Sequence, residues 1–239
     1  MKVTLIAHSM VAEAGFAVES ISAIAIGQCY NKSFDLADVS QSTNLLEHVI
    51  NSGHESVIEH ITFTFLIEGV SRSLTHQLVR HRIASYTQKS QRYTDGSDFT
   101  PIIPESILHN KQKKEVFDTC MDSIKDAYKK LKELGTKDED ARAVLPNACD
   151  TNIVVTMNAR VLGHLFAERR CVRAQDEINQ LVTEMSKICR KVCPTIFKTC
   201  KLGFAKCVRL GYCPEGKTCG RYPRLKDLLK NKEYKTVNE

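Results

Sequence analysis

Arginine, histidine and hydroxyl side chains crowd residues 80–93 of the sequence. This segment begins with Arg80-His81-Arg82, and Ser90 and Arg92 follow after a short interval. Arginine stays protonated and offers five donors in a planar fork, which suits a phosphate or the polar edge of a pyrimidine. Hydroxyl donors add to such a site. The segment therefore indicates an anion-binding surface, although a basic turn after a helix is also commonly a solvated surface.

A second polar segment, residues 53–60, contains two histidines and two glutamates. The side chains of His54, Glu55, Glu59 and His60 could ligate a metal ion or act in acid–base catalysis. Alternatively, the segment is a polar helical turn, because Ser56 and Glu59 have the spacing of a capping box. A motif this short leaves both interpretations open.

Charged residues also occur in a third, more dispersed set. Arg142 lies among apolar residues, and Asn158 and Arg160 open a predicted helix, where free backbone donors favour an anion. The charged run 168–177 includes Arg169 and could equally form charge pairs on a helix surface. The sequence has no Gly-x-Gly-x-x-Gly and no Walker-type loop. Any dinucleotide is therefore bound without the Rossmann fingerprint.

Apolar spacing predicts the elements that must position these residues. Alternation predicts strands at 1–7, 61–67 and 152–157. The arginine-rich segment is expected to leave its helix as a loop at 83–93. Helices interspersed with few strands favour an α+β fold with a mixed or antiparallel sheet. Helical spacing predicts helices at 19–30, 40–50, 71–79, 111–134, 159–168 and 174–192, and a capping box of Thr136 and Glu139 predicts a short helix ending near Pro146.

The composition limits the class of protein. The 239 residues are 42% apolar and carry a net charge of +6. This charge would attract an anionic substrate, but it is too small to imply nucleic acid binding by itself. Neither a signal peptide nor an apolar run long enough to span a membrane is visible. We therefore expect a cytoplasmic protein that binds neither nucleic acid nor a membrane.

Six cysteines lie between residues 189 and 219. Their spacing lacks the Cys-x-x-Cys of a structural zinc site, so three interpretations remain: reduced thiols, a metal clip or disulfides. Reduced thiols fit a cytoplasmic protein best. We expect one domain over residues 1–193 and a cysteine- and lysine-rich extension over residues 194–239.

Three motifs together resemble those of a known family. They are Arg-His-Arg followed by seven residues and Ser90, Gly-His-Glu-Ser at 53–56, and Arg-Ala-Gln at 173–175. The chain resembles the flavin-dependent thymidylate synthases from about Ser33 to Glu177. The resemblance implies an α+β homotetramer whose subunits share active sites. It also implies that the enzyme makes dTMP from dUMP with FAD, methylenetetrahydrofolate as carbon donor and NADPH as reductant, without a protein nucleophile.

The same resemblance implies a role for individual residues, none of which is a metal ligand. Arg169 would be catalytic, because it would favour negative charge on the uracil ring. His54 would lie where folate or nicotinamide stacks on the flavin. The FAD contacts would be Ser33, Ser56, Glu59, Arg80, His81, Arg82, Gln88, Asn158, Arg160 and His164. The dUMP contacts would be Gln77, Arg80, Gln88, Lys89, Ser90, Gln91, Arg92, Arg142 and Arg169.

Four positions depart from the pattern expected of the family. Gln88 replaces a frequent glutamate, Lys89 and Gln91 replace smaller residues, and Asp176 replaces a tryptophan. On the residues alone, two other functions stay open. One is a nucleotide- or RNA-binding module without catalysis, in which Tyr86 and Tyr93 stack on bases. The other is a metal-dependent enzyme that uses the histidines and glutamates of residues 54–60.

Overall fold

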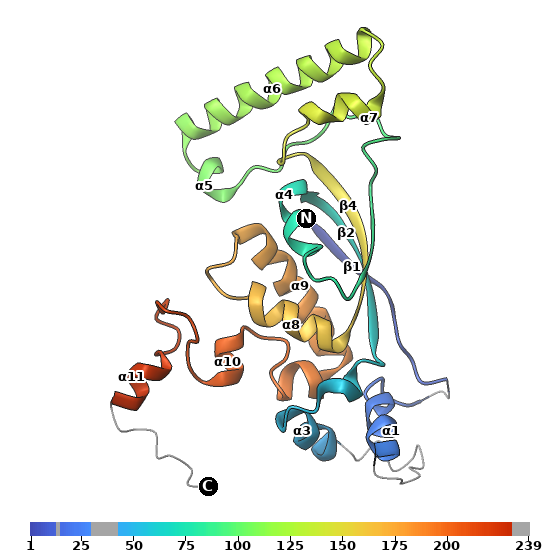
Figure 1. Ribbon diagram of the computed structural model, residues 1–239, viewed down its shortest axis with the longest axis vertical. Coiled ribbons are helices and arrows are strands. Elements are labelled where there is room, and N and C mark those ends of the chain that lie inside the picture. Colours follow the sequence, from blue (N-terminus) through green and yellow to red (C-terminus); the bar gives the residue numbers. More distant parts are fainter. Residues whose placement is uncertain (13–14, 30–42, 231–239) are drawn as a thin grey trace. The chain divides into compact units, whose positions relative to one another are not determined.

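A four-stranded sheet connects the segments that carry the predicted site residues. The computed structural model describes residues 1–12, 15–29 and 43–230. The fold is α+β, as the sequence predicts, and Figure 1 shows the sheet among the helices. In the described part, the strands are ordered β1 (Lys2–His8), β2 (Thr62–Ser71), β4 (Asp150–Asn158) and β3 (Ser85–Gln88) across the sheet.

The strands of this sheet run antiparallel. β3 pairs with β4 in antiparallel register. On the other side of β4, the Thr64 and Thr156 hydroxyl oxygens are 2.9 Å apart, and the Gly69 amide donates to the Asn152 side chain. β2 and β4 therefore run antiparallel. The predicted strands at 1–7, 61–67 and 152–157 are confirmed.

Alternate burial explains why these segments form strands. Every second residue is buried along β4 and along β2 as far as Ile67, whereas the residues between them are partly or fully exposed. Successive side chains of a strand point to opposite faces, so one face packs on the core and the other does not. The buried side chains include Phe63, Phe65 and Ile67 on β2, and Ile153, Val155 and Met157 on β4.

The chain packs as two compact units, each made of segments that are separate in sequence. Unit 1 contains residues 1–7, 64–157 and 176–181, and unit 2 contains 8–63, 158–175 and 182–239, so far as these are described. The predicted domain boundary after residue 193 stays a prediction. Among the described helices, none is long and apolar enough to cross a membrane.

The predicted helices are present with small shifts at their ends, although residues 30 and 40–42 of two of them lie outside the described part. The sequence does not predict the short elements that begin at residues 105, 195, 206 and 225. In unit 1 the helices are α4 (Arg72–Leu78), α5 (Glu105–Leu108), α6 (Lys111–Glu133), α7 (Asp138–Ala141) and the 3₁₀ turn η2 (Arg142–Val144). In unit 2 they are α1 (Ser20–Cys29), α3 (Thr43–Asn51), the 3₁₀ turn η1 (Glu55–Ile58), α8 (Ala159–Arg169), most of α9 (Asp176–Val192), the π-helical turn η3 (Thr195–Thr199), α10 (Lys206–Leu210) and α11 (Leu225–Lys230).

Three local predictions are wrong. The segment expected to be a loop at 83–93 contains β3, a short strand that the sequence pattern does not reveal because its side chains are only partly buried or exposed. Neither predicted capping box forms. The turn η1 begins one residue before Ser56, and α7 begins after Lys137 rather than Thr136, without a side-chain cap in either case.

Aromatic side chains join the C-terminal segment to the core of unit 2. The Phe197 ring meets Phe63 and Phe166 edge-on, with centroid separations of 5.8 and 5.9 Å. The Ile196 amide donates to the Glu19 carboxylate at 2.8 Å. All three rings are fully buried. The segment that begins at residue 194 therefore packs into unit 2 rather than lying on its surface.

All ten cysteines are free thiols, so the disulfide interpretation is wrong. Burial raises the pKa of the Cys200 thiol to about 12, and it also raises the pKa values of Cys189 and Cys193. These three thiols therefore stay protonated near neutral pH. Three other thiols are exposed: Cys29, Cys120 and Cys219.

Candidate active site

Predicted site residues of unit 1 follow α4 and β3 in one continuous stretch of chain. Gln77 lies near the end of α4, the Arg80-His81-Arg82 triplet follows it, and Gln88 ends β3. The Tyr86 phenol on β3 lies 2.9 Å from the Leu78 carbonyl oxygen and 2.8 Å from the His81 carbonyl oxygen. A single hydroxyl therefore ties the end of α4 and the triplet to the sheet.

Gln88 bonds inside the protein. Its amide nitrogen donates to the Thr75 hydroxyl at 3.0 Å and to the Thr151 hydroxyl at 3.3 Å. A glutamate at this position could only accept from these hydroxyls, whereas the amide donates to them. The departure at Gln88 thus reverses the direction of the hydrogen bonds at the end of β3. It also fixes the start of the loop that carries Lys89, Ser90, Gln91 and Arg92.

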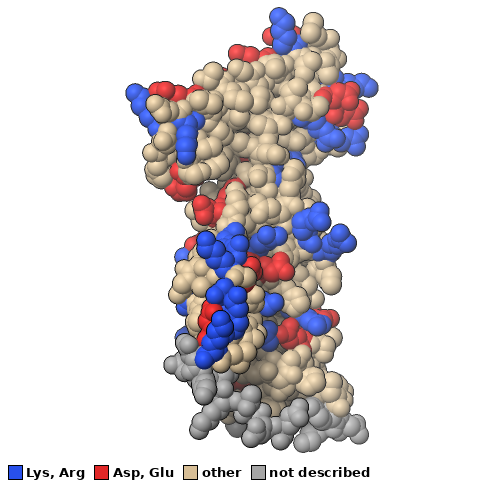
Figure 2. Space-filling model, turned by 60° about the vertical axis from the view of Figure 1, so that its left-hand side comes forward, with Lys and Arg blue, Asp and Glu red and all other residues tan. Residues whose placement is uncertain are grey.

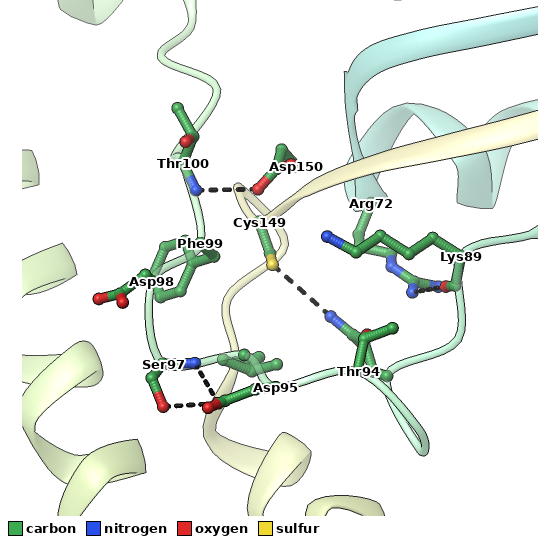
Figure 3. A pocket seen from close by; sticks show the side chains of 13 residues that line it. Arg72, Lys89, Thr94, Asp95, Ser97, Asp98, Phe99, Thr100, Cys149 and Asp150 are labelled. Carbon is green, nitrogen blue, oxygen red and sulfur yellow. Dashed lines mark hydrogen bonds between the residues drawn. The ribbon is translucent and has the colours of Figure 1, made fainter.

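A cavity of about 180 Å³ lies beside this loop in unit 1. Lys89, Gln91 and Arg72 contribute to its wall, together with Cys149 (Figure 3). The Arg72 guanidinium donates to the Lys89 carbonyl oxygen at 2.5 Å, and the Gln91 amide lies 3.6 Å from the Cys149 sulfur. The cavity therefore has two basic side chains from different elements at one wall.

Sequence reasoning missed Arg72. Burial lowers the pKa of its guanidinium, yet arginine remains charged in proteins. Its Nε is buried without a hydrogen-bond partner in the described part of the chain. A buried donor without a protein partner can be satisfied by a water, an ion or a ligand. Its neighbour Arg142 also lowers this pKa, so the two guanidinium groups lie within electrostatic range of each other.

Glu139 brings two predicted dUMP contacts together. The Arg92 guanidinium donates to the Glu139 carboxylate at 2.8 and 3.2 Å, and Arg142 Nε donates to the Glu139 carbonyl oxygen at 3.0 Å. These arginines are 50 positions apart in sequence, and both contact a residue of α7. The sequence suggests Glu139 only as part of a helix cap. Its role in orienting two arginines depends on tertiary contacts that the sequence does not reveal.

Predicted site residues of unit 2 gather around a buried carboxylate. Glu55 is 9% exposed and lies on η1. Its Oε2 is 3.8 Å from Arg160 Nε and 3.7 Å from His164 Nε2, both on α8. Its Oε1 is 2.7 Å from Arg209 on α10. The sequence suggests Glu55 as a metal ligand or an acid–base group, and it does not identify Arg209.

Asn158 sets the position of Arg160. The Asn158 side chain accepts from the Val161 amide at 2.9 Å and thereby caps α8, as expected of an asparagine before a helix. Arg160 Nη1 then donates to Glu59 at 2.5 Å. The Arg160 side chain keeps 41% of its surface exposed, so it can still meet a ligand. His54 and Ser56, the other predicted residues near η1, are exposed.

The metal interpretation finds no support in this geometry. No group of three or more His, Cys, Asp or Glu side chains in the described ranges is placed to hold a metal ion. Glu55 and Glu59 are instead paired with arginines. The C-terminal cysteines likewise form no such group in the described part, so the metal-clip interpretation has no candidate site there.

Of the run 168–177, only part is available to a ligand. Arg169 ends α8 and is half-buried. Arg170 donates to the Gly203 carbonyl oxygen and stacks on Phe204, so it serves the core of unit 2. Glu177 accepts from the Ser71 amide at 2.7 Å within unit 1. Ser33, another predicted FAD contact, lies outside the described residues.

Surface charge does not form a continuous basic area on the face shown in Figure 2, where acidic side chains accompany the basic ones. This mixture agrees with the modest net charge of +6. A module that binds nucleic acid would be expected to gather its basic residues on one face.

Comparison with known proteins decides the family. Residues 12–195 match the family described as thymidylate synthase complementing protein. A flavin-dependent thymidylate synthase of Nitratidesulfovibrio vulgaris is 47% identical over 220 residues, covering 83% of this chain and 88% of the relative. The chain belongs to the flavin-dependent thymidylate synthase family. The prediction from the three sequence motifs is therefore confirmed.

Other relatives extend this match. A flavin-dependent thymidylate synthase of Geobacter sulfurreducens is 43% identical over 236 residues, covering 96% of this chain and 98% of the relative. One of Pyrococcus furiosus is 44% identical over 197 residues, covering 79% and 80%. Membership of this family disfavours the alternatives of a binding module without catalysis and of a metal-dependent enzyme.

The Tyr86 hydroxyl allows a test of how β3 holds the end of α4 and the Arg80-His81-Arg82 triplet. We expect Tyr86→Phe to lower the free energy of unfolding by about 1 kcal/mol, because the Leu78 and His81 carbonyl groups lose the one hydroxyl proton that they share. Burial raises the pKa of Tyr86 to about 12. The unfolded chain, with an ordinary tyrosine pKa near ~10, releases the proton first. Tyr86 therefore contributes fully below pH ~10 and loses its contribution as the pH rises through ~12.

Urea unfolding at several pH values measures this contribution. The difference in unfolding free energy between the wild type and Tyr86→Phe should shrink between pH ~10 and ~12. Tyr93→Phe is the matched control, since the Tyr93 ring is 79% exposed. A difference that stays constant over this range would contradict the role given to the phenol.

Proposed function

We propose that this protein catalyses the reductive methylation of dUMP to dTMP, with methylenetetrahydrofolate as carbon donor, NADPH as reductant and FAD as cofactor. One observation carries the proposal: the family match at residues 12–195 contains every predicted site residue, from Ser33 to Arg169. The relatives that support it are named flavin-dependent thymidylate synthases. We further propose a cytoplasmic homotetramer whose subunits share active sites.

The donor set of unit 2 fits a flavin dinucleotide. FAD carries a diphosphate, and Arg160 and His164 offer exposed nitrogen donors beside each other on α8. Glu55 and Glu59 hold these donors from the protein side. Bound FAD would supply the transfer of hydride and of the one-carbon unit. We propose that Ser33, Ser56, Glu59, Arg80, His81, Arg82, Gln88, Asn158, Arg160 and His164 bind it, and that His54 stacks the folate or nicotinamide ring.

The donor set of unit 1 fits a nucleotide monophosphate. Arg92 and Arg142 meet at Glu139, and Lys89 lies on the cavity wall with Arg72, so that cations from several elements could meet one phosphate. Gln77, Arg80, Gln88, Ser90, Gln91 and Arg169 complete the proposed dUMP contacts. Arg169 would stabilise negative charge on the uracil ring and thereby make its C5 nucleophilic.

A reaction without a protein nucleophile agrees with the state of Cys149. This thiol is the cysteine on the wall of the unit 1 cavity. Burial raises its pKa, so the reactive thiolate is scarce near neutral pH. Ser90 is proposed as a substrate contact rather than a nucleophile. Its hydroxyl oxygen accepts from the Arg92 amide at 3.1 Å and keeps its own proton to donate to a ligand.

The visible spectrum of the purified protein tests the function directly. We expect the absorption bands of an oxidised flavin, and a change in these bands when dUMP is added, because both ligands would occupy one active site. dCMP is the control nucleotide, since it has the same phosphate and a different base edge. A protein that stays colourless after reconstitution with FAD would overturn the proposal.

Arg169→Ala tests the catalytic assignment. We expect the variant to keep its flavin spectrum and to lose about 10²–10³-fold in the rate of dTMP formation, as expected when a charge-stabilising donor is removed. Arg173→Ala is the matched control, because Arg173 follows closely in sequence and pairs with Glu215 at 3.3 Å. Ordinary turnover in Arg169→Ala would eliminate the proposed role.

Arg72→Ala tests the cation that sequence reasoning missed. Without its donor to the Lys89 carbonyl oxygen, the dUMP loop loses a fixed point and the cavity loses a charge. We expect the KM for dUMP to rise about tenfold, which corresponds to ~1.4 kcal/mol, with kcat little changed. Arg72→Lys should recover part of the affinity, since it keeps the charge but not the fork. An unchanged KM in both variants would show that Arg72 serves only the fold.

A further inference from the structure

The carboxylate of Glu55 is surrounded by nitrogen groups that come from two helices. Arg160 and His164 approach one oxygen from α8, and Arg209 approaches the other from α10 at 2.7 Å. The Glu55 side chain is 10% exposed, whereas Arg209 is 36% exposed. A buried carboxylate is costly unless it is paired, so these groups make the ionised state of Glu55 tolerable.

Arg209 provides the closest of these contacts, yet it lies beyond the residues that the family model matches. The match ends at residue 195, and α10 begins at Lys206. α8 packs against both η1 and α10. The C-terminal segment thus delivers a charge to a carboxylate that also contacts two proposed flavin ligands. The relative of Geobacter sulfurreducens also covers this segment, but no motif assigns a function to it.

We infer that Arg209 is a positioning residue of the flavin site, which acts through Glu55 on Arg160 and His164. This inference rests on the proposed function, because it takes Arg160 and His164 as FAD contacts. Arg209 occupies Oε1 of Glu55 and leaves only Oε2 to the two residues on α8. Arg160 is then held by Glu55 on one side and by Glu59 on the other, with part of its fork exposed to a ligand.

Removing Arg209 should strengthen the contacts of Glu55 with Arg160 and His164. The buried carboxylate loses its shortest partner and must compensate its charge with Arg160 and His164. Both side chains would turn further toward Glu55 and away from an anionic ligand. Arg160 would also be drawn from Glu59, another proposed flavin contact. The expected result is weaker binding of FAD without loss of the fold, because Arg209 is partly exposed and the aromatic core of unit 2 does not include it.

The experiment compares the affinity of the full-length protein for FAD in three variants. We expect Arg209→Ala to raise the Kd for FAD about tenfold, and Arg209→Lys to recover most of this loss by restoring the charge. Arg224→Ala is the matched control. Arg224 is also in the C-terminal segment, is 31% exposed and pairs with Asp227 at 2.6 Å, but has no contact with Glu55. An equal loss in Arg224→Ala, or no loss in Arg209→Ala, would overturn the inference.

A double-mutant cycle shows whether Arg209 acts through Glu55. In Glu55→Gln the carboxylate charge is gone, so Arg209→Ala should then change the Kd for FAD less than about twofold. The same tenfold loss in both backgrounds would mean that Arg209 acts by another route, and the inference would fail.

The apo protein provides a second readout that does not depend on FAD. The ¹⁵N–¹H NMR signal of Arg160 Nε should shift in Arg209→Ala and stay in place in Arg224→Ala. An unshifted signal would overturn the positioning role. If the wild type binds no FAD while this signal shifts as expected, the proposed function fails and the coupling of Arg209 to Arg160 stands.

Discussion

The burial of the Glu55 carboxylate is the constraint on which the proposed FAD-binding residues of unit 2 depend. An ionised carboxylate removed from water requires cations or strong donors around it. The chain meets this requirement with side chains from α8 and α10, and the same contacts orient the donors that a ligand would meet. The cap that Asn158 places on α8 fixes where these donors start. The same contacts therefore compensate the buried charge and orient the donors of the proposed binding surface.

In unit 1, a surface carboxylate orients the proposed dUMP contacts in the same way. The Glu139 side chain accepts from Arg92, and its carbonyl oxygen accepts from Arg142. Each guanidinium keeps further N–H donors for a ligand. Exposed ion pairs contribute little to stability, so the value of this arrangement lies in orientation. The backbone is fixed in the same way: Arg72 holds the Lys89 carbonyl, and Tyr86 holds those of Leu78 and His81. Glu139, Tyr86 and the contact of Arg72 with the Lys89 backbone thus determine where the proposed substrate contacts lie.

Local pattern predicted most of the elements, whereas the contacts of the site needed the fold. The period-2 alternation of β2 and the helical spacing of α6 were sufficient to identify both. β3 was missed because four residues with partial burial carry little pattern. The sequence suggests Glu55 as a metal ligand or an acid–base group and Glu139 as part of a helix cap. Their arginine partners are distant in sequence or come from a segment without a motif. Motif resemblance supplied the residue roles, and these remain proposals.

The three buried thiols near the C-terminus have a practical consequence for studying how this segment opens. Cys189, Cys193 and Cys200 are protonated and shielded, while Cys29, Cys120 and Cys219 face solvent. A short pulse of an alkylating reagent should therefore mark the second set at once and the first set only in molecules whose core has opened. Mass spectrometry of the tagged peptides would convert that contrast into an opening rate for the segment, without any engineered label.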